Sequence, residues 1–397
     1  MAAAAQLSAR GSLLALFLVV LTGMIGFGIF VPIFPFLSLH LGGTATETTI
    51  AMGAYSFGQL VAAPAWGRLS DAVGRKPVLI AGLIGAGASY VMIAYAANVE
   101  ALGFARLFGG LMAGNVGAAF AAAPDLADER TRTRNMGLLG AAFALGFIFG
   151  PGLGALIVGD RPDTEGFRRV CLMAAAFALL AALAAAAFFR ETLAAGARRP
   201  AAAPRDGRAA LLIKRPALAQ LVAVTLMMIA AQALMETTFG LWSDAQLSWG
   251  PRETGVAFAV LGLMTVGLQG GGAGWLAKRL GERRMLLGGL TLFALGFAAL
   301  GAAQTTWQAY AALALLAVGG GAATPALSSM VGAQAGEQER GLVMGLNQSA
   351  SALGRVIGPA FAGLLFDQFG HSSPFWVGAG VLACAVALAA FAAPKRA

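Results

Sequence analysis

The chain has 397 residues, of which 58% are hydrophobic and only 11% are charged. Soluble proteins carry about 25% charged residues, so this composition excludes a set of water-soluble domains and predicts a polytopic membrane protein. The formal net charge of +9 does not indicate nucleic-acid binding, because the basic residues gather in short segments between apolar stretches.

Twelve apolar stretches follow one another along the chain, and each can cross a bilayer as a helix of about 20 residues. The first six lie near 13–39, 48–67, 77–97, 100–124, 136–159 and 168–189. The other six lie near 217–241, 254–276, 285–304, 307–332, 342–366 and 374–393. These stretches are continuously apolar and do not alternate, which excludes a β-barrel.

The basic residues predict the orientation of the spans. Most of the 27 lysines and arginines fall in segments that share one side with the N-terminus, including a basic stretch from Arg190 to Arg215. By the positive-inside rule both termini are expected in the cytoplasm. The Ala- and Arg-rich, Lys-poor composition is typical of GC-rich bacterial genomes, so a multi-pass protein of the bacterial inner membrane is expected.

The two halves of the sequence repeat. The segment that begins at Gly67 recurs at Gly274, and Gly150-Pro151 recurs as Gly358-Pro359, at offsets of 207 and 208 residues. Parallel repeats of this kind are a common transporter design. The expected fold is therefore all-α, with 12 transmembrane helices in two six-helix bundles. Their ranges are 1–190 for the N-terminal bundle, 191–215 for a cytoplasmic linker and 216–397 for the C-terminal bundle.

The ten residues GRLSDAVGRK after the second span form the most specific pattern. Gly67 and Gly74 predict a tight reversal of the chain, while Arg75 and Lys76 are expected to hold the turn at the anionic inner membrane surface. Asp71 is unusual in so basic a loop and predicts a charged partner, although a solvated loop charge is the alternative.

This pattern resembles the loop signature of the major facilitator superfamily. The resemblance implies that Asp71, Arg75 and Asp125 close a cytoplasmic gate. The segment from Arg106 to Gly110 resembles the second motif of the same family, which implies a role for Arg106 in proton coupling or in packing against the first span. The resemblance also implies a proton-coupling role for Asp125. A purely structural Arg106 and a capped helix end at Asp125 are the alternatives.

The fifth span carries Gly146, Gly150, Pro151 and Gly154, which resemble the antiporter signature of drug exporters. A proline bends the span and glycines permit close helix packing, so a kinked packing face is a compatible interpretation. The chain is further similar to tetracycline-efflux-like members. It carries Gly23, Ser89 and Phe293 where those exporters have acids, which argues against recognition of tetracycline with its metal.

Among the polar residues of the second half, Glu236 is expected to be the main proton carrier, because it is the one carboxylate well within a predicted span. It lies ~28 Å along its helix from Ala217, so the alternative is that it reaches water at the outer surface. Arg355, together with Arg106, would favour an anionic or zwitterionic substrate. The expected substrate cavity includes Gln232, Gln269, Asn347, Gln348 and Arg355.

The sequence contains no nucleotide-binding P-loop, no HExxH and no GxSxG, and no enzyme, cofactor or metal site is expected. The sequence predicts a monomeric secondary active transporter that exports small amphipathic compounds in exchange for protons within a lipid bilayer. The alternatives are a carrier of an anionic amphiphile or lipid and a metabolite uptake carrier. A non-transporting membrane sensor or enzyme is the alternative from a different class.

Overall fold

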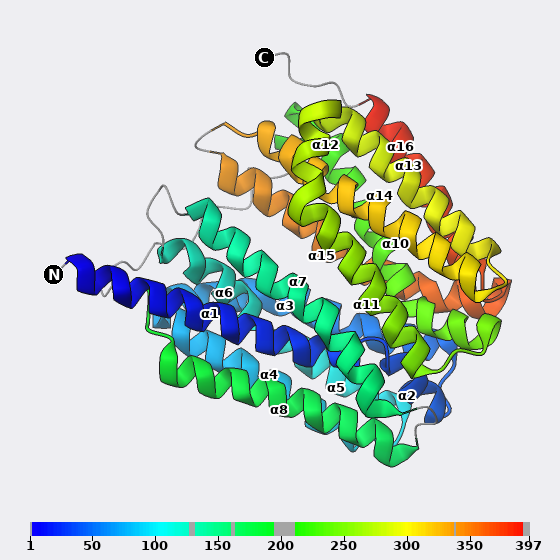
Figure 1. Ribbon diagram of the computed structural model, residues 1–397, viewed down its shortest axis with the longest axis horizontal. Helices are drawn as coiled ribbons and strands as arrows, with labels where there is room; N and C mark the ends of the chain where they lie inside the picture. The colour runs from blue at the N-terminus through cyan, green and yellow to red at the C-terminus, as the bar shows by residue number, and fades with distance from the viewer. Residues whose placement is uncertain (1, 127–131, 160–162, 194–210, 337–338, 392–397) are drawn as a thin grey trace. The chain divides into compact units, whose positions relative to one another are not determined.

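The structure is a computed structural model that describes residues 2–126, 132–159, 163–193, 211–336 and 339–391. In these ranges every regular element is a helix (Figure 1). The helices of the first half are α1 (Ala2–Phe30), α2 (Phe34–His40), α3 (Ala45–Val73), α4 (Arg75–Ala94), α5 (Val99–Leu111), α6 (Gly114–Asp125), α7 (Arg132–Val158) and α8 (Thr164–Phe188).

The second half continues the all-helical pattern. Its elements are α10 (Pro216–Leu247), α11 (Pro251–Gly267), a π-helical segment η1 (Leu268–Gly272), α12 (Ala273–Leu280), α13 (Glu282–Ala302), α14 (Thr306–Ala333), α15 (Arg340–Phe369) and α16 (Ser373–Phe391). Within the described ranges, 10 helical stretches are long and apolar enough to cross a membrane. The other two predicted spans, 48–67 and 100–124, correspond to α3 and to the pair α5–α6. The all-α fold with 12 spans is confirmed.

The span predicted over 100–124 is broken between α5 and α6. Gly110 lies so close to α3 that a Cβ atom there would be 2.0 Å from the Tyr55 carbonyl oxygen, and one on Gly114 would overlap the Trp66 ring. The Trp66 indole N–H donates to the Leu111 carbonyl oxygen at 2.7 Å. This hydrogen bond satisfies a carbonyl near the end of α5, so the break costs less in a medium without water.

The chain divides into two compact units that each draw a short segment from the opposite half. Unit 1 comprises Met1–Gly43, Ala54–Ala202 and Gly250–Ala259, and unit 2 comprises Thr44–Gly53, Ala203–Trp249 and Val260–Ala397. The first residues of α3 therefore pack within unit 2, and the first residues of α11 within unit 1.

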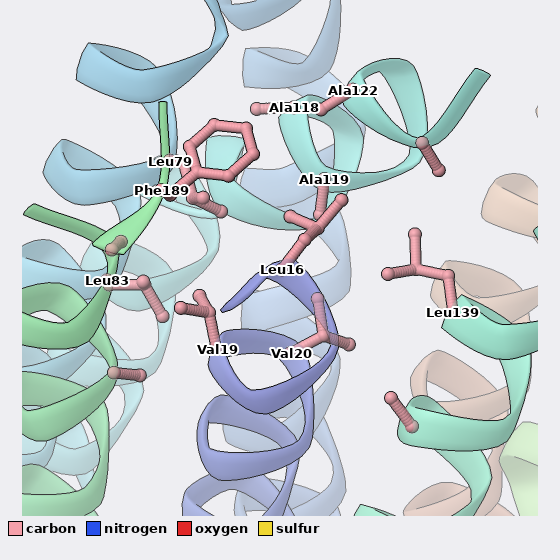
Figure 2. Packing of buried hydrophobic residues seen from close by; sticks show 14 of the residues in the cluster. Leu16, Val19, Val20, Leu79, Leu83, Ala118, Ala119, Ala122, Leu139 and Phe189 are labelled. Atoms are coloured by element: carbon pink, nitrogen blue, oxygen red, sulfur yellow. The ribbon is translucent and has the colours of Figure 1, made fainter. Parts of the chain in front are cut away.

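A cluster of buried side chains lies among α1, α4, α6, α7 and α8 of unit 1 (Figure 2). Leu16 and Val19 of α1 meet Leu79 and Leu83 of α4, and small alanines of α6 let the helices approach. Phe189, which follows α8, is 1% exposed within this cluster. Its burial fixes the chain immediately before Glu191, which is important for the site described next.

The predicted repeat is also visible in the packing. In α7, a Cβ atom on Gly150 would lie 2.5 Å from Gly28 Cα of α1. In α15, a Cβ atom on Gly358 would lie 2.4 Å from the Ala230 carbonyl oxygen of α10. Each unit therefore joins its first long helix to a helix with an equivalent Gly-Pro pair through the same kind of glycine contact.

Candidate functional site

Arg75, the first residue of α4, organises a cluster of polar side chains at the α3–α4 turn. Its guanidinium Nη1 lies 2.6 Å from Asp71 Oδ1 and 3.0 Å from Ser70 Oγ, and its Nε lies 3.3 Å from Asp125 Oδ2. Arg75 is 9% exposed, whereas the side chains of Asp71 and Asp125 are 47% and 32% exposed, so the acids shield a buried guanidinium from their partly exposed positions. The structure thus brings together the three charged residues that the family resemblance singled out, from α3, α4 and α6.

Glu191 completes this cluster, and the sequence interpretation missed it. Its carboxylate accepts the backbone N–H groups of Arg75 at 2.9 Å and Lys76 at 3.0 Å, which are the first two residues of α4. It also accepts the N–H groups of Thr192 and Leu193. Partial burial raises the pKa of Glu191, but the backbone N–H donors outweigh this effect and hold the pKa below its usual range. A negative charge here is stabilised by the positive end of the α4 dipole.

Gly74 makes the turn that this cap requires. Its φ of 109° lies in the region that only glycine adopts readily, and a Cβ atom there would overlap the Glu191 carboxylate. The prediction that Gly67 also reverses the chain is wrong, because Gly67 lies inside α3 with nothing within 4 Å of its Cβ position. Lys76 donates from Nζ to the Ala186 carbonyl oxygen at 2.7 Å.

The second copy of the motif keeps the turn but exchanges the charges. Gly281 has a φ of 76° and joins α12 to α13, as Gly74 joins α3 to α4. Lys278 occupies the position that corresponds to Asp71, and Glu282 occupies that of Arg75. Glu282 accepts a hydrogen bond from Ser329. Of the two copies, only the first forms the arginine-centred cluster.

Arg106 of α5 lies in a cage of aromatic rings. Its guanidinium carbon is 4.6 Å from the ring centre of Tyr55, 5.4 Å from that of Phe30 and 5.6 Å from that of Phe34. Arg106 is 5% exposed, and its Nε has no hydrogen-bond partner among the described residues. No described carboxylate forms an ion pair with it, so cation–π contacts surround this charge.

The three positions at which the family resemblance implies acids are packed in this chain. Ser89 is 3% exposed and donates to the Ala105 carbonyl oxygen at 2.8 Å. Phe293 is 4% exposed and packs edge-on against Phe297. A Cβ atom on Gly23 would lie 3.2 Å from Leu83. In the described part of the chain no group of three His, Cys, Asp or Glu residues is arranged to hold a metal ion.

In unit 2, three of the predicted residues meet between α10 and α15. Glu236 Oε1 accepts a hydrogen bond from Gln232 Nε2 at 2.8 Å, and Glu236 Oε2 lies 3.9 Å from Arg355 Nη1. The span predicted to end at residue 241 continues as helix to Leu247. Glu236 therefore lies ~16 Å before the end of its helix. Its carboxylate is paired along α10 and across to α15.

The other predicted cavity residues lie apart from this group. Asn347 Oδ1 accepts a hydrogen bond from Thr225 Oγ1 at 2.7 Å, two helical turns before the Gln232–Glu236 pair on α10. Gln348 is exposed on α15, and Gln269 is exposed in the π-helical segment η1. A π-helical turn inside a long helix is frequent at functional sites. The structure shows no contact that joins these two glutamines to Glu236 or Arg355.

Comparison with known proteins identifies the family. The family model described as Major Facilitator Superfamily matches residues 16–273 and 244–397. A tetracycline resistance protein, class E, from Escherichia coli is 28% identical over 98% of this chain and 96% of its own length. Multidrug resistance protein 2 from Bacillus subtilis is 28% identical over 88% of this chain and 87% of its own.

A solved structure of similar fold is the human organic anion transporter MFSD10 (TETRAN). It is 25% identical to this chain, has a TM-score of 0.72 and covers 96% of this chain and 99% of its own. Its fold and the match of the family model over nearly the whole length agree with the all-helical architecture described above. The chain therefore belongs to the Major Facilitator Superfamily and is a membrane transporter, not an enzyme.

Proposed function

We propose that this chain is a proton-coupled antiporter that exports small amphipathic compounds from the bacterial cytoplasm by alternating access. Relatives named for tetracycline and multidrug resistance support export of drug-like compounds. The resemblance of Gly146, Gly150, Pro151 and Gly154 in α7 to the antiporter signature supports exchange over uptake. We further propose that residues 1–190 and 216–397 are the two halves that rock, joined by 191–215, with both termini in the cytoplasm.

The cluster around Arg75 is proposed to be the cytoplasmic gate. Its charges lie on three helices and on the chain after α8, so movement of any one of these elements breaks an ion pair of Arg75 or the cap on α4. Separation would leave the buried guanidinium of Arg75 without a carboxylate partner, which is unfavourable. A two-state element of this kind can hold one conformation until substrate or proton binding favours the other.

Glu236 is proposed to be the main proton carrier. The observation that carries this assignment is its position inside α10, with the carboxylate bound to Gln232 on one side and near Arg355 on the other. A carboxylate that faces a single cation can bind a proton in place of its interaction with that cation, and the protonated acid then carries no charge. Arg106 is proposed to contribute a fixed positive charge, and Asp125 is the next candidate for the proton.

Export by the variant Glu236→Gln in proteoliposomes tests this assignment. The glutamine has almost the same shape and cannot titrate, so exchange of labelled substrate without a gradient is expected to persist while uphill export driven by a pH gradient is lost. Asp244→Asn, eight residues further along the same helix, is the matched control and should retain uphill export. Uphill export at the wild-type rate by Glu236→Gln would contradict the assignment.

One observation favours a second class of substrate. The side chain of Arg355 is 46% exposed, and a guanidinium is suited to a carboxylate or sulfonate. The human relative of similar fold is described as an organic anion transporter. Transport of an organic anion is therefore the second candidate function.

A further inference from the structure

We propose that Arg355 binds the anionic group of an organic solute when Glu236 is protonated, so that this solute and one proton bind together. The inference deepens the second candidate function and rests on the proposed role of Glu236 as a protonatable group. Arg355 thereby gains a ligand of its own, and binding of this ligand is coupled positively to binding of the proton.

The ion pair of Glu236 and Arg355 has members that differ in burial and in hydrogen bonding. Glu236 is the more buried, with a side chain 25% exposed and one oxygen held by the Gln232 amide at 2.8 Å. Arg355 is 46% exposed and makes no hydrogen bond to any described residue. The 3.9 Å between them is beyond hydrogen-bonding distance, so the contact is purely electrostatic. The N–H donors of Arg355 are therefore available to another oxyanion.

Among the described residues of unit 2, no other acid is placed to replace Glu236 beside Arg355. The helices α14 and α16 of unit 2 contain no Asp, Glu, Lys, Arg or His. On α10 the next acid is Asp244, ~12 Å beyond Glu236, and on α15 it is Asp367, ~18 Å beyond Arg355. The remaining charged or titratable groups of α15, of the turn after it and of the segment Thr44–Gly53 are Arg340, His371 and Glu47.

Two of the acids outside the pair, Asp367 and Glu47, already have partners, as does His371. Asp367 Oδ2 accepts the backbone N–H of Thr46 at 2.9 Å and its hydroxyl at 2.6 Å. Glu47 accepts the N–H and hydroxyl of Thr44, and His371 Nε2 lies 2.6 Å from Gln246 Oε1. Protonation of Glu236 therefore leaves Arg355 as a cation without a counter-charge inside a membrane span, which is costly.

The backbones of α10 and α15 are in close contact around Arg355. Gly354 and Gly358 flank Arg355, and Cβ atoms there would lie 2.9 Å from the Leu226 carbonyl oxygen and 2.4 Å from that of Ala230. This glycine contact holds α15 against α10 in the turns that carry the ion pair. A ligand that supplies the missing negative charge is the remaining solution, and a planar carboxylate or a sulfonate can accept two guanidinium N–H groups at once.

The consequence is a positive linkage between the proton and the anion. Each favours binding of the other by the same factor, because the coupling free energy is reciprocal. An anionic solute bound at Arg355 therefore moves in the same direction as the proton, whereas a compound that displaces the proton moves against it. A single ion pair would give the carrier opposite coupling for two classes of solute.

Isothermal titration calorimetry on the full chain in phosphatidylcholine nanodiscs tests this proposal. The probe is naphthalene-2-sulfonate, which stays ionised between pH 5 and 8, and the neutral naphthalene-2-sulfonamide is its control. The sulfonate is expected to bind about tenfold or more tightly at pH 5 than at pH 8, within the usual range of coupling between two sites. Buffers of different ionisation enthalpy should report uptake of about one proton per anion bound at an intermediate pH.

Variants separate the two residues of the pair. Glu236→Gln should bind the sulfonate at pH 8 as tightly as the wild type does at pH 5, and Arg355→Gln should not bind it at either pH. Asp244→Asn should match the wild type. If Arg355→Gln does not fold, the double variant Glu236→Gln/Arg355→Gln removes both charges together and should also fail to bind. An affinity of the wild type that does not change with pH, or binding retained without Arg355, would overturn the proposal.

This experiment is independent of export. If the wild-type protein shows the proton–anion linkage but no pH-driven drug export, only the proposed antiport is refuted. Normal antiport without the linkage would refute this inference alone. Adding phosphatidylglycerol to the nanodiscs identifies the natural source of the anion: competition with the sulfonate indicates a lipid headgroup, and absence of competition indicates a soluble solute. Both outcomes support an anion site at Arg355.

Discussion

The carboxylate of Glu191 accepts the backbone N–H of Arg75 at 2.9 Å, although 116 residues separate them in the chain. A residue that follows α8 thereby caps the helix whose first side chain holds Asp71 and Asp125. The cap and the ion pairs share Arg75, so a substitution that disrupts the cap should also alter the geometry of the ion pairs, and the reverse.

Glu191→Gln should lower the thermal stability of the protein. The amide retains the shape but loses the charge at the positive end of α4, a loss of about 1 kcal/mol on the scale measured for helix N-caps. Glu165→Gln is the matched control, because Glu165 is a largely exposed residue on α8 that pairs only with Arg168. Tm measured in detergent by differential scanning fluorimetry should fall for the first variant and stay unchanged for the second.

The same residue predicts a pH dependence. Because the pKa of Glu191 is held below its ordinary value of 4.5, its stabilisation is fully present above that value and is lost as the pH falls through the lowered pKa. The difference in Tm between wild type and Glu191→Gln should therefore be constant from pH 8 to about pH 5 and shrink below it. A difference that instead grows on acidification would contradict the direction of the shift.

Gly74→Ala and Gly67→Ala should behave in opposite ways although both glycines belong to the same motif. Gly74 has a φ of 109° and its Cβ position overlaps the Glu191 carboxylate, so alanine there should destabilise the protein and disturb the cluster. Gly67 lies in a helix with open space around it, so alanine should be neutral or stabilising by up to about 1 kcal/mol. Equal effects of the two substitutions on Tm would contradict this account of the turn.

Asp71→Asn should weaken the proposed cytoplasmic gate. Removing this charge takes away the 2.6 Å partner of Arg75, so the conformation open to the cytoplasm should become more populated and transport should fall. Cysteines introduced at Gln232 or Gln348 should then react faster with a maleimide added from the cytoplasmic side. Unchanged reactivity together with full transport would remove Asp71 from the gate, and Glu165→Gln again serves as the control.

Gly150→Ala should be far more harmful than Gly152→Ala in the same helix. A Cβ atom on Gly150 would lie 2.5 Å from Gly28 Cα, whereas the nearest atom to one on Gly152 is 4.0 Å away. Forcing α1 and α7 apart is expected to cost about 1–3 kcal/mol, as for other overpacked interiors. The yield of monodisperse protein and its Tm should both fall for the first variant only.

Much of the fold follows from composition and periodicity alone. Continuous apolar stretches and the offset repeats predict the number of spans and the pairing of α7 with α15 as equivalent helices. The break between α5 and α6 was not predictable, because it depends on the tertiary contact between Gly110 and Tyr55 and on the hydrogen bond from Trp66. The predicted span ends at residue 241, but α10 continues to Leu247. The hydropathy decreases before the end of the helix, so hydropathy alone placed this end too early.

The site was predictable where a motif names its residues and unpredictable where the partner is distant in the chain. Asp71, Arg75 and Asp125 were expected to meet, and they do. Glu191 lies in a stretch that is typical of a flexible linker. The sequence feature that could have indicated its role is that it is a single acid between Arg190 and the basic residues that follow. Gln269, Asn347 and Gln348 are polar residues in apolar spans, but polarity alone does not specify which helix faces they share with Glu236.

Proton-driven export can be measured as transport by the wild-type protein under a pH gradient of known direction. Inverted proteoliposomes that expose the cytoplasmic side should accumulate a fluorescent cationic drug such as ethidium when their interior is acidic, and should release it when the gradient is collapsed with a protonophore. Reversal of the gradient should reverse the movement. Accumulation that is indifferent to the direction of the pH gradient would contradict proton-coupled export by this protein.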